Sequence, residues 1–246
     1  MSSANYVSLS SATVLERSLD STANNIANMS TTGFKASRPL LDSLPFDGSG
    51  GDGGEVSFVQ DKGYYLDLSQ GTLTRTENTL DVAISGPDWF SYEGPDGTTA
   101  YGRDGRLVLT VDGLLTTTTG AAILDAGGGR ITLPADIGSQ VTIARDGTIA
   151  DQTGNALGRL GLFSISNPNA LNPIGGGLYK DPGAAGIDVA QDSAVLQGFL
   201  EGSNVQATVE VTRLMEIQRA YERAIKVIDQ TDELTRTAIQ SISRSV

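Results

Sequence analysis

The C-terminal segment carries the most regular pattern of the sequence, in residues 203–228, which read SNVQATVEVTRLMEIQRAYERAIKVI. Apolar side chains recur along it with steps of three, four, four and three residues. They are Leu214, Ile217, Tyr221, Ile225 and Ile228. This spacing places the side chains on one face of a helix. Because Ser203 and Gln206 fit a capping box, the pattern predicts a helix that begins there and runs for about 40 residues, or near 60 Å.

The N-terminal segment has the same spacing. Its apolar stripe consists of Ala12, Leu15, Leu19, Ala23 and Ile26. The pattern predicts a helix of about 23 residues. We expect it to end near Asn28, because asparagines crowd its last turns and Gly33 follows a run of small polar residues.

Each apolar stripe is narrow and requires a partner helix to cover it. The two ends of one chain can supply only one another. We therefore expect an α+β fold in which the N- and C-terminal helices pair as a coiled-coil stalk, with an all-β domain inserted between them. A helix near 60 Å is also too long for one compact domain of this size.

The middle of the chain is acidic and holds nearly all of the 30 glycines. Apolar residues alternate along short runs there, as they do in strands. The runs are Leu80, Val82, Ile84; Leu107, Leu109, Val111; Ile131, Leu133; and Val141, Ile143. Asp-Gly pairs at 96–97, 104–105, 112–113 and 146–147 predict turns, and the eight-residue spacing of the first three indicates a β-meander.

These patterns divide the chain into four regions. Residues 1–36 form the N-terminal stalk helix, and 37–75 form a connecting segment. Residues 76–190 form the β-rich domain, and 191–246 form a return segment and the C-terminal stalk helix. The glycine-rich run at 48–54 predicts a linker or loop tip, since no Lys-Ser/Thr pair follows it as in a phosphate loop.

The composition excludes most catalytic chemistry. The 246 residues include no Cys and no His, so disulfides, thiolate nucleophiles, His-based triads and the usual zinc and haem sites are excluded. The Asp-Gly loops lack the spacing of calcium-binding loops. We expect no catalytic residue, no metal site and no cofactor. One alternative of another class stays open: a secreted protein that binds or cleaves glycans with two convergent carboxylates of the middle region.

The charge and hydropathy patterns limit the choice of partners. Lys and Arg number 17 and Asp and Glu 29, so the net charge is 17 − 29 = −12, which disfavours nucleic acid and anionic lipid surfaces. No run approaches the roughly 18 apolar residues of a membrane span. The first basic residue, Arg17, lies within an amphipathic pattern rather than ahead of an apolar run. We expect neither membrane insertion nor a cleaved signal peptide.

Separated stretches of the sequence carry distinctive motifs. Residues 19–35 read LDSTANNIANMSTTGFK, residues 200–205 read LEGSNV, and residues 216–222 read EIQRAYE. The middle adds QGTL at 70–73, LDVAISG at 80–86 and RDG at 103–105. In their order along the chain, the motifs resemble the signatures of the axial proteins of the bacterial flagellum, the rod and hook family. The likeness runs over nearly the whole chain.

Within this family, the opening residues 5–10, NYVSLS, and the modest length resemble the proximal-rod members most. The resemblance implies a non-enzymatic structural subunit of the basal-body rod, which spans the periplasm and transmits torque for motility. It implies type III export by the flagellum's own apparatus without a cleaved signal peptide. The implied partners are other copies of the chain, neighbouring rod proteins and that export apparatus. A distal-rod or hook subunit stays open as an alternative.

The resemblance also implies that the subunits assemble helically through their terminal helices. The predicted assembly interface combines the apolar seams with the asparagines and the aromatic residue of the N-terminal motif. Its residues are Leu15, Leu19, Asn24, Asn25, Ile26, Asn28, Phe34, Leu214, Ile217, Tyr221, Ile225 and Ile228.

Overall fold

The computed structural model describes residues 3–46, 56–134, 137, 140–190 and 193–244, so the glycine-rich run at 48–54 lies outside the described residues. The chain divides into two compact units. Unit 1 consists of Met1–Ala27, Ser37–Tyr65 and Gln206–Val246. Unit 2 consists of Asn28–Ala36 and Leu66–Val205. The chain therefore passes from one unit to the other four times.

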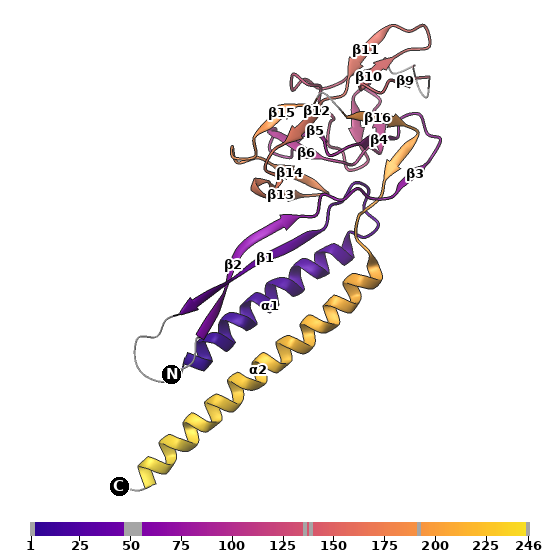
Figure 1. Ribbon diagram of the computed structural model, residues 1–246. Coiled ribbons are helices and arrows are strands. Elements are labelled where there is room, and N and C mark those ends of the chain that lie inside the picture. Colours follow the sequence, from indigo (N-terminus) through magenta and orange to yellow (C-terminus); the bar gives the residue numbers. More distant parts are fainter. Residues whose placement is uncertain (1–2, 47–55, 135–136, 138–139, 191–192, 245–246) are drawn as a thin grey trace. The chain divides into compact units, whose positions relative to one another are not determined.

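Unit 1 contains two helices and a two-stranded sheet (Figure 1). Helix α1 spans Ser3–Ala27 and helix α2 spans Ala207–Arg244. Strands β1, Ser37–Phe46, and β2, Val56–Leu66, pair with each other. Helix α1 contacts both α2 and β1. Since α2 has 38 residues and α1 has 25, α2 extends past the end of α1 (Figure 1).

The helix ends test the capping predictions. Helix α1 ends at Ala27, as the sequence predicted to within one residue. Helix α2 begins at Ala207, so the predicted start at Ser203 is wrong. The hydroxyl of Ser203 accepts a hydrogen bond from the Val205 amide at 3.2 Å and forms a local turn instead. The carbonyl of Gln206 accepts from the Glu210 amide at 3.0 Å, which places the helix cap at Gln206.

Unit 2 is built from short strands and one 3-10 turn, η1, Pro168–Ala170. The strands are β3 Leu73–Arg75, β4 Val82–Ser85, β5 Trp89–Glu93, β6 Thr99–Gly102, β7 Leu107–Leu109, β8 Leu115–Thr117, β9 Thr142–Ile143, β10 Thr148–Ala150, β11 Ala156–Arg159, β12 Leu162–Ile165, β13 Asn172–Gly175, β14 Leu178–Lys180, β15 Ile187–Val189, β16 Ala194–Gln197 and β17 Phe199–Glu201.

The largest sheet of unit 2 has six strands in the order β13-β14-β6-β5-β12-β15. A three-stranded sheet, β11-β10-β9, and the pairs β16-β4, β17-β3 and β7-β8 complete the unit. The main core includes Tyr92, Leu115, Ile123 and Ile149, which are fully buried. A second cluster surrounds Trp89, whose ring meets that of Tyr179 edge to face with centroids 5.5 Å apart.

Three predictions for the middle region are wrong in detail. The β-meander does not form, because β7 pairs with β8 rather than with β6. Val111 does not continue the inward alternation of β7; it lies in the following turn and is 95% exposed. Ile131 and Leu133 are buried as expected, but they lie beside isolated β-bridges instead of within a strand.

The Asp-Gly pairs follow two different physical requirements. Gly97, Gly113 and Gly147 have φ values of +75°, +76° and +84°, which glycine adopts without strain. Gly105 is required for another reason: a Cβ there would lie 1.6 Å from the Val82 carbonyl oxygen. The sequence predicted turns at all four pairs, but the glycine of the pair at 104–105 is required by a close backbone approach.

Candidate assembly surface

Helix α1 buries a face of small, mainly polar side chains within unit 1. Ser18, Ser21, Thr22 and Asn25 are all buried, and Val14 lies on the same face. The Asn25 amide nitrogen donates to the Ser37 carbonyl at 2.9 Å, and the Ser37 amide donates to Asn25 Oδ1 at 3.0 Å. Ser21 Oγ donates to the same carbonyl at 2.8 Å. These bonds fasten α1 to the start of β1.

The predicted apolar stripe of α1 lies beside this polar face. Leu15, Leu19 and Ile26 are half-buried, Ala12 is buried and Ala23 is exposed. Because the chain buries the polar face completely and this stripe only in part, the stripe retains accessible apolar surface.

The three asparagines and the phenylalanine of the predicted interface differ in exposure. Asn24 is exposed and Asn28 is half-buried, with its side-chain oxygen accepting from the Thr31 hydroxyl at 3.1 Å. Asn25 and Phe34 are 1% and 7% exposed. Both are therefore covered within the chain itself, Asn25 in unit 1 and Phe34 in unit 2.

Helix α2 has one buried residue among its described side chains, Glu210. Its carboxylate pairs with Arg38 of β1 at 3.2 Å, which fastens the first turn of α2 inside unit 1. The predicted stripe follows along the helix and is half-buried at every position. Its members are Leu214, Ile217, Tyr221, Ile225 and Ile228.

A second apolar line lies on another face of α2. Val209, Val227 and Leu234 are 47%, 45% and 70% exposed. They are 18 and 7 residues apart, close to whole numbers of helical turns, so they lie above one another. At 100° per residue this line lies about 130° around the helix from the centre of the half-buried stripe. The chain leaves it uncovered.

Further large apolar side chains of unit 1 are exposed on the hairpin and at the start of α1. They are Leu9, Leu40, Leu41, Tyr64 and Tyr65. Scattered exposed leucines are normal on a monomer. Aligned apolar side chains on elongated elements are typical of surfaces that other proteins cover.

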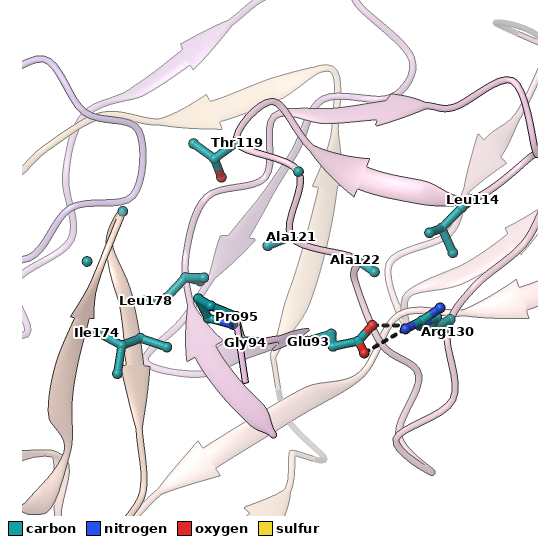
Figure 2. A pocket seen from close by; sticks show the side chains of 13 residues that line it. Glu93, Gly94, Pro95, Leu114, Thr119, Ala121, Ala122, Arg130, Ile174 and Leu178 are labelled. Carbon is teal, nitrogen blue, oxygen red and sulfur yellow. Dashed lines mark hydrogen bonds and ion pairs between the residues drawn. The ribbon is translucent and has the colours of Figure 1, made fainter. Parts of the chain in front are cut away.

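Unit 2 contains a hollow of about 590 Å³ with mainly apolar and glycine walls, shown in Figure 2. At its rim Glu93 accepts two hydrogen bonds from Arg130, at 2.5 and 2.7 Å. The bonds from Arg130 hold the pKa of Glu93 below its usual value, so this carboxylate is a poor general base. Among the described residues, acidic side chains form no cluster of three or more that could hold a metal ion.

Comparison with known proteins gives matches along most of the chain. Residues 6–35 match the family described as flagella basal body rod protein, residues 83–151 match the flagellar hook protein FlgE/F/G D1 domain, and residues 196–241 match the C-terminal domain of flagellar basal body rod FlgEFG proteins. The flagellar basal-body rod protein FlgF of Caulobacter vibrioides is 38% identical, with 99% of each chain aligned. The chain belongs to the flagellar basal-body rod protein family.

Other members of the rod protein family are also similar over most of their length. FlgF of Mesorhizobium japonicum is 34% identical and covers 96% of each chain. FlgG of Agrobacterium fabrum is 35% identical and covers 89% of this chain and 91% of its own. The family regions of this rod protein include α1, most of α2 and strands of unit 2.

The sequence reasoning missed the outer apolar line of this rod protein. Val209, Val227 and Leu234 do not fit the stripe with steps of three and four that the reasoning followed. A signal was present, because steps of 18 and 7 residues also return to one side of a helix. Within the described residues, no helix of the rod protein combines the length and apolarity that crossing a bilayer requires.

Proposed function

We propose that this chain is a structural subunit of the proximal rod of the bacterial flagellum, and that it polymerises through unit 1. The observation that carries the proposal is the outer line of Val209, Val227 and Leu234, which is exposed in a single chain. Membership in the rod protein family supports a structural role. The 38% identity with the FlgF of Caulobacter vibrioides, over 99% of both chains, supports the FlgF type.

The terminal helices form the stalk of the subunit in this proposal. Helices α1 and α2 pair as a coiled coil through the predicted stripes, and residues 76–190 form the inserted β domain. The half-burial of Leu19 and Ile225 supports this pairing, because a narrow seam covers only one side of each helix. The remaining surface of α1 and α2 is available to neighbouring copies.

Assembly stabilises the helices by burying their exposed apolar side chains. Full burial of one Val or Leu contributes about 1.5–3 kcal/mol. Several such side chains per subunit, repeated through a symmetric assembly, give a tightly packed tube. Twisting this tube would force many close-packed contacts to slide together, and packed interiors resist such deformation. The subunit thereby transmits torque as a scaffold and not as an enzyme.

The partners follow from this role. They are other copies of the chain, the rod proteins above and below it, and the flagellar export apparatus that delivers it without a cleaved signal peptide. The assembled rod spans the periplasm. The net charge of −12 and the lack of His and Cys support a protein partner rather than nucleic acid or a metal.

Substitution on the outer line tests the proposal. Val227→Asp places a carboxylate where a neighbouring subunit would pack, at a cost of about 3 kcal/mol or more per contact. We expect the variant to be exported but to leave cells non-motile, with no complete rod in electron micrographs of basal bodies. Gln218→Asp, at an exposed polar position of the same helix, is the matched control and should swim normally. Normal rods with Val227→Asp would refute assembly through this line.

A further inference from the structure

Unit 2 contains a buried cluster of three charged side chains from distant parts of the sequence. Glu201, at the end of β17, is 1% exposed and lies between two cations. Its Oε1 accepts from Lys35 Nζ at 2.7 Å, and its Oε2 accepts from Arg103 Nε at 2.8 Å. Lys35 and Arg103 are 1% and 2% exposed. Burying such a cluster is favourable only when every charge is paired and hydrogen-bonded.

The same three side chains also bind backbone groups of several segments. Glu201 Oε1 accepts from the Gly71 amide at 3.0 Å, and Lys35 Nζ donates to the Ser69 carbonyl at 2.7 Å. Arg103 donates to the carbonyl of Asp88 at 2.7 Å, and through its other terminal nitrogen to the carbonyl of Gly86 at 2.8 Å. The cluster therefore joins residues 33–36, 69–71 and 201–204 to the β core.

Asn204 adds a second set of bonds between the same segments. Its Oδ1 accepts from the Ala36 amide at 2.8 Å, and its Nδ2 donates to the Asp67 carbonyl at 2.8 Å. The Gly33 amide donates to the Glu201 carbonyl at 2.8 Å. The side chains of Asn204 and Glu201 thus connect three segments of the chain. The most distant of the residues joined in this way, Ala36 and Asn204, are 168 residues apart in the sequence.

Glycines allow these segments to approach each other closely. A Cβ on Gly71 would lie 2.0 Å from the Gly202 carbonyl oxygen. Gly33 has φ +68°, and a Cβ there would lie 2.3 Å from the Arg103 carbonyl carbon. Both positions exclude every other residue by contact with backbone atoms.

These three segments are the ones that lead to the four crossings between the units. The segment 28–36 has a crossing at each of its ends. The third crossing comes immediately before Leu66, and the fourth comes immediately after Val205. We propose that Glu201, Lys35, Arg103 and Asn204 form a clamp in unit 2 that positions all of these crossing segments together.

A subunit that transmits torque requires a fixed arrangement of its segments, and the clamp supplies this arrangement. This point rests on the proposed function. A buried ion cluster is weak evidence for stability and a better device for fixing one arrangement. Here it fixes the register of β17 on β3, in which Glu201 faces Leu73. A slip of this strand would remove the carboxylate from both cations, so the charges specify where the chain leaves unit 2.

Hydrogen exchange of the purified full-length chain tests the clamp without requiring assembly. Glu201→Gln keeps the shape but presents an NH₂ group to a cation. We expect amide exchange at Gly33, Gly71 and Gly202 to rise about tenfold or more, because their bonds depend on the clamp. Exchange at Leu115 and Ile123 in the β core should stay within about twofold. The proposal would be overturned if the three glycines exchanged as slowly as in the unmodified chain, or if exchange rates rose uniformly over unit 2.

A control and a second variant complete the test. Glu93→Gln removes the same charge from an exposed ion pair of unit 2 and should leave exchange at the three glycines unchanged. If Glu201→Gln does not fold, Arg103→Lys is measured instead, because it keeps the charge but loses the forked donor geometry. Protection of the glycines in that variant would equally refute the clamp. Motility is scored separately, so loss of swimming with unchanged exchange bears on the proposed function alone.

Discussion

Asn25 and Ser37 exchange two hydrogen bonds, at 2.9 and 3.0 Å, across twelve residues that leave unit 1 and return to it. The side chain of Asn25 copies the pattern of a paired β-strand residue, with one donor and one acceptor facing the backbone of Ser37. The last turn of α1 is therefore fixed to the first residue of β1.

Replacing Asn25 with leucine should destabilise unit 1. The variant leaves the Ser37 amide without its side-chain partner, while the Ser37 carbonyl keeps its bond from Ser21 Oγ, and a buried unsatisfied group costs about 1–3 kcal/mol. We expect earlier unfolding of the helical signal in circular dichroism on heating. Glu16→Ala, at an exposed position of α1, is the control and should change the transition little. An unchanged transition with Asn25→Leu would show that the pair contributes nothing measurable.

Isolated subunits should lose α2 to protease before unit 2. Helix α2 has one buried residue among its described side chains, and helices take most of their stability from packing. Trypsin sites at Arg213, Arg219 and Arg223 are exposed. We expect cleavage there within the first minutes of limited digestion, followed by a resistant fragment that contains residues 66–205. The prediction is contradicted if mass spectrometry shows unit 2 cut before α2 in a proven monomer.

Helical periodicity explains why the two helices of unit 1 were predictable, whereas strands β1 and β2 lie in the segment 37–75 that was expected only to connect. Steps of three and four residues located α1, its end at Ala27 and the half-buried stripe that begins at Leu214. The buried face with Ser18 and Asn25 was not predictable, because a hydropathy pattern treats small polar residues as exposed. The burial of Asn25 depends on its bonds to the Ser37 backbone, which no local pattern reveals.

The clamp was beyond sequence reasoning for a related reason. Lys35 and Glu201 are 166 residues apart, and charged residues are almost never fully buried. Their motifs were recognised, but the motifs could not show that the two charges meet. The opposite error was made at Val111. The apolar alternation predicted that this residue lies in a strand, but it lies in a turn and is exposed.

Buried Tyr179 should make unit 2 sensitive to alkali. Burial raises the pKa of Tyr179 from 10.0 to about 12. The unfolded chain releases this proton near pH 10 and the folded chain does not, so stability falls as the pH rises from 10 to 12, by about 3 kcal/mol at most. Tyr179→Phe should flatten the loss of stability over this range in urea unfolding. A residual slope is expected, because burial also raises the pKa of Tyr92 and Tyr101.

The control for this titration is Tyr65→Phe, which changes a tyrosine that is 37% exposed. It should leave the alkaline profile as steep as in the unmodified chain. The Tyr179 hydroxyl lies 3.5 Å from the Lys35 carbonyl, a long and weak hydrogen bond, so Tyr179→Phe should change stability little at pH 8. Identical alkaline profiles for both variants and the unmodified chain would refute the assignment.

Neutralising two turn carboxylates should separate a scaffold from a catalyst. Burial raises the pKa of Asp104, so the fold disfavours its ionised form. This lowers the stability of the fold at pH 7, and the loss disappears as the pH falls toward 3.8. Bonds from Thr148 lower the pKa of Asp146, so its contribution is present at pH 7 and is lost on acidification below 3.8. Asp104→Asn should therefore keep or raise Tm at pH 7, and Asp146→Asn should lower it slightly.

Both asparagine variants should assemble and swim, because Asn Oδ1 can still accept the bonds from Arg106 and Thr148 that shape the two turns. A catalytic carboxylate behaves differently, since its removal suppresses turnover by orders of magnitude while the fold persists. The decisive measurement pairs motility of each variant with release of sugars from peptidoglycan by purified protein. Release by the unmodified chain that disappears in either variant would establish glycan cleavage. Inactivity of all three proteins, with motility intact, fits a subunit whose carboxylates only build turns.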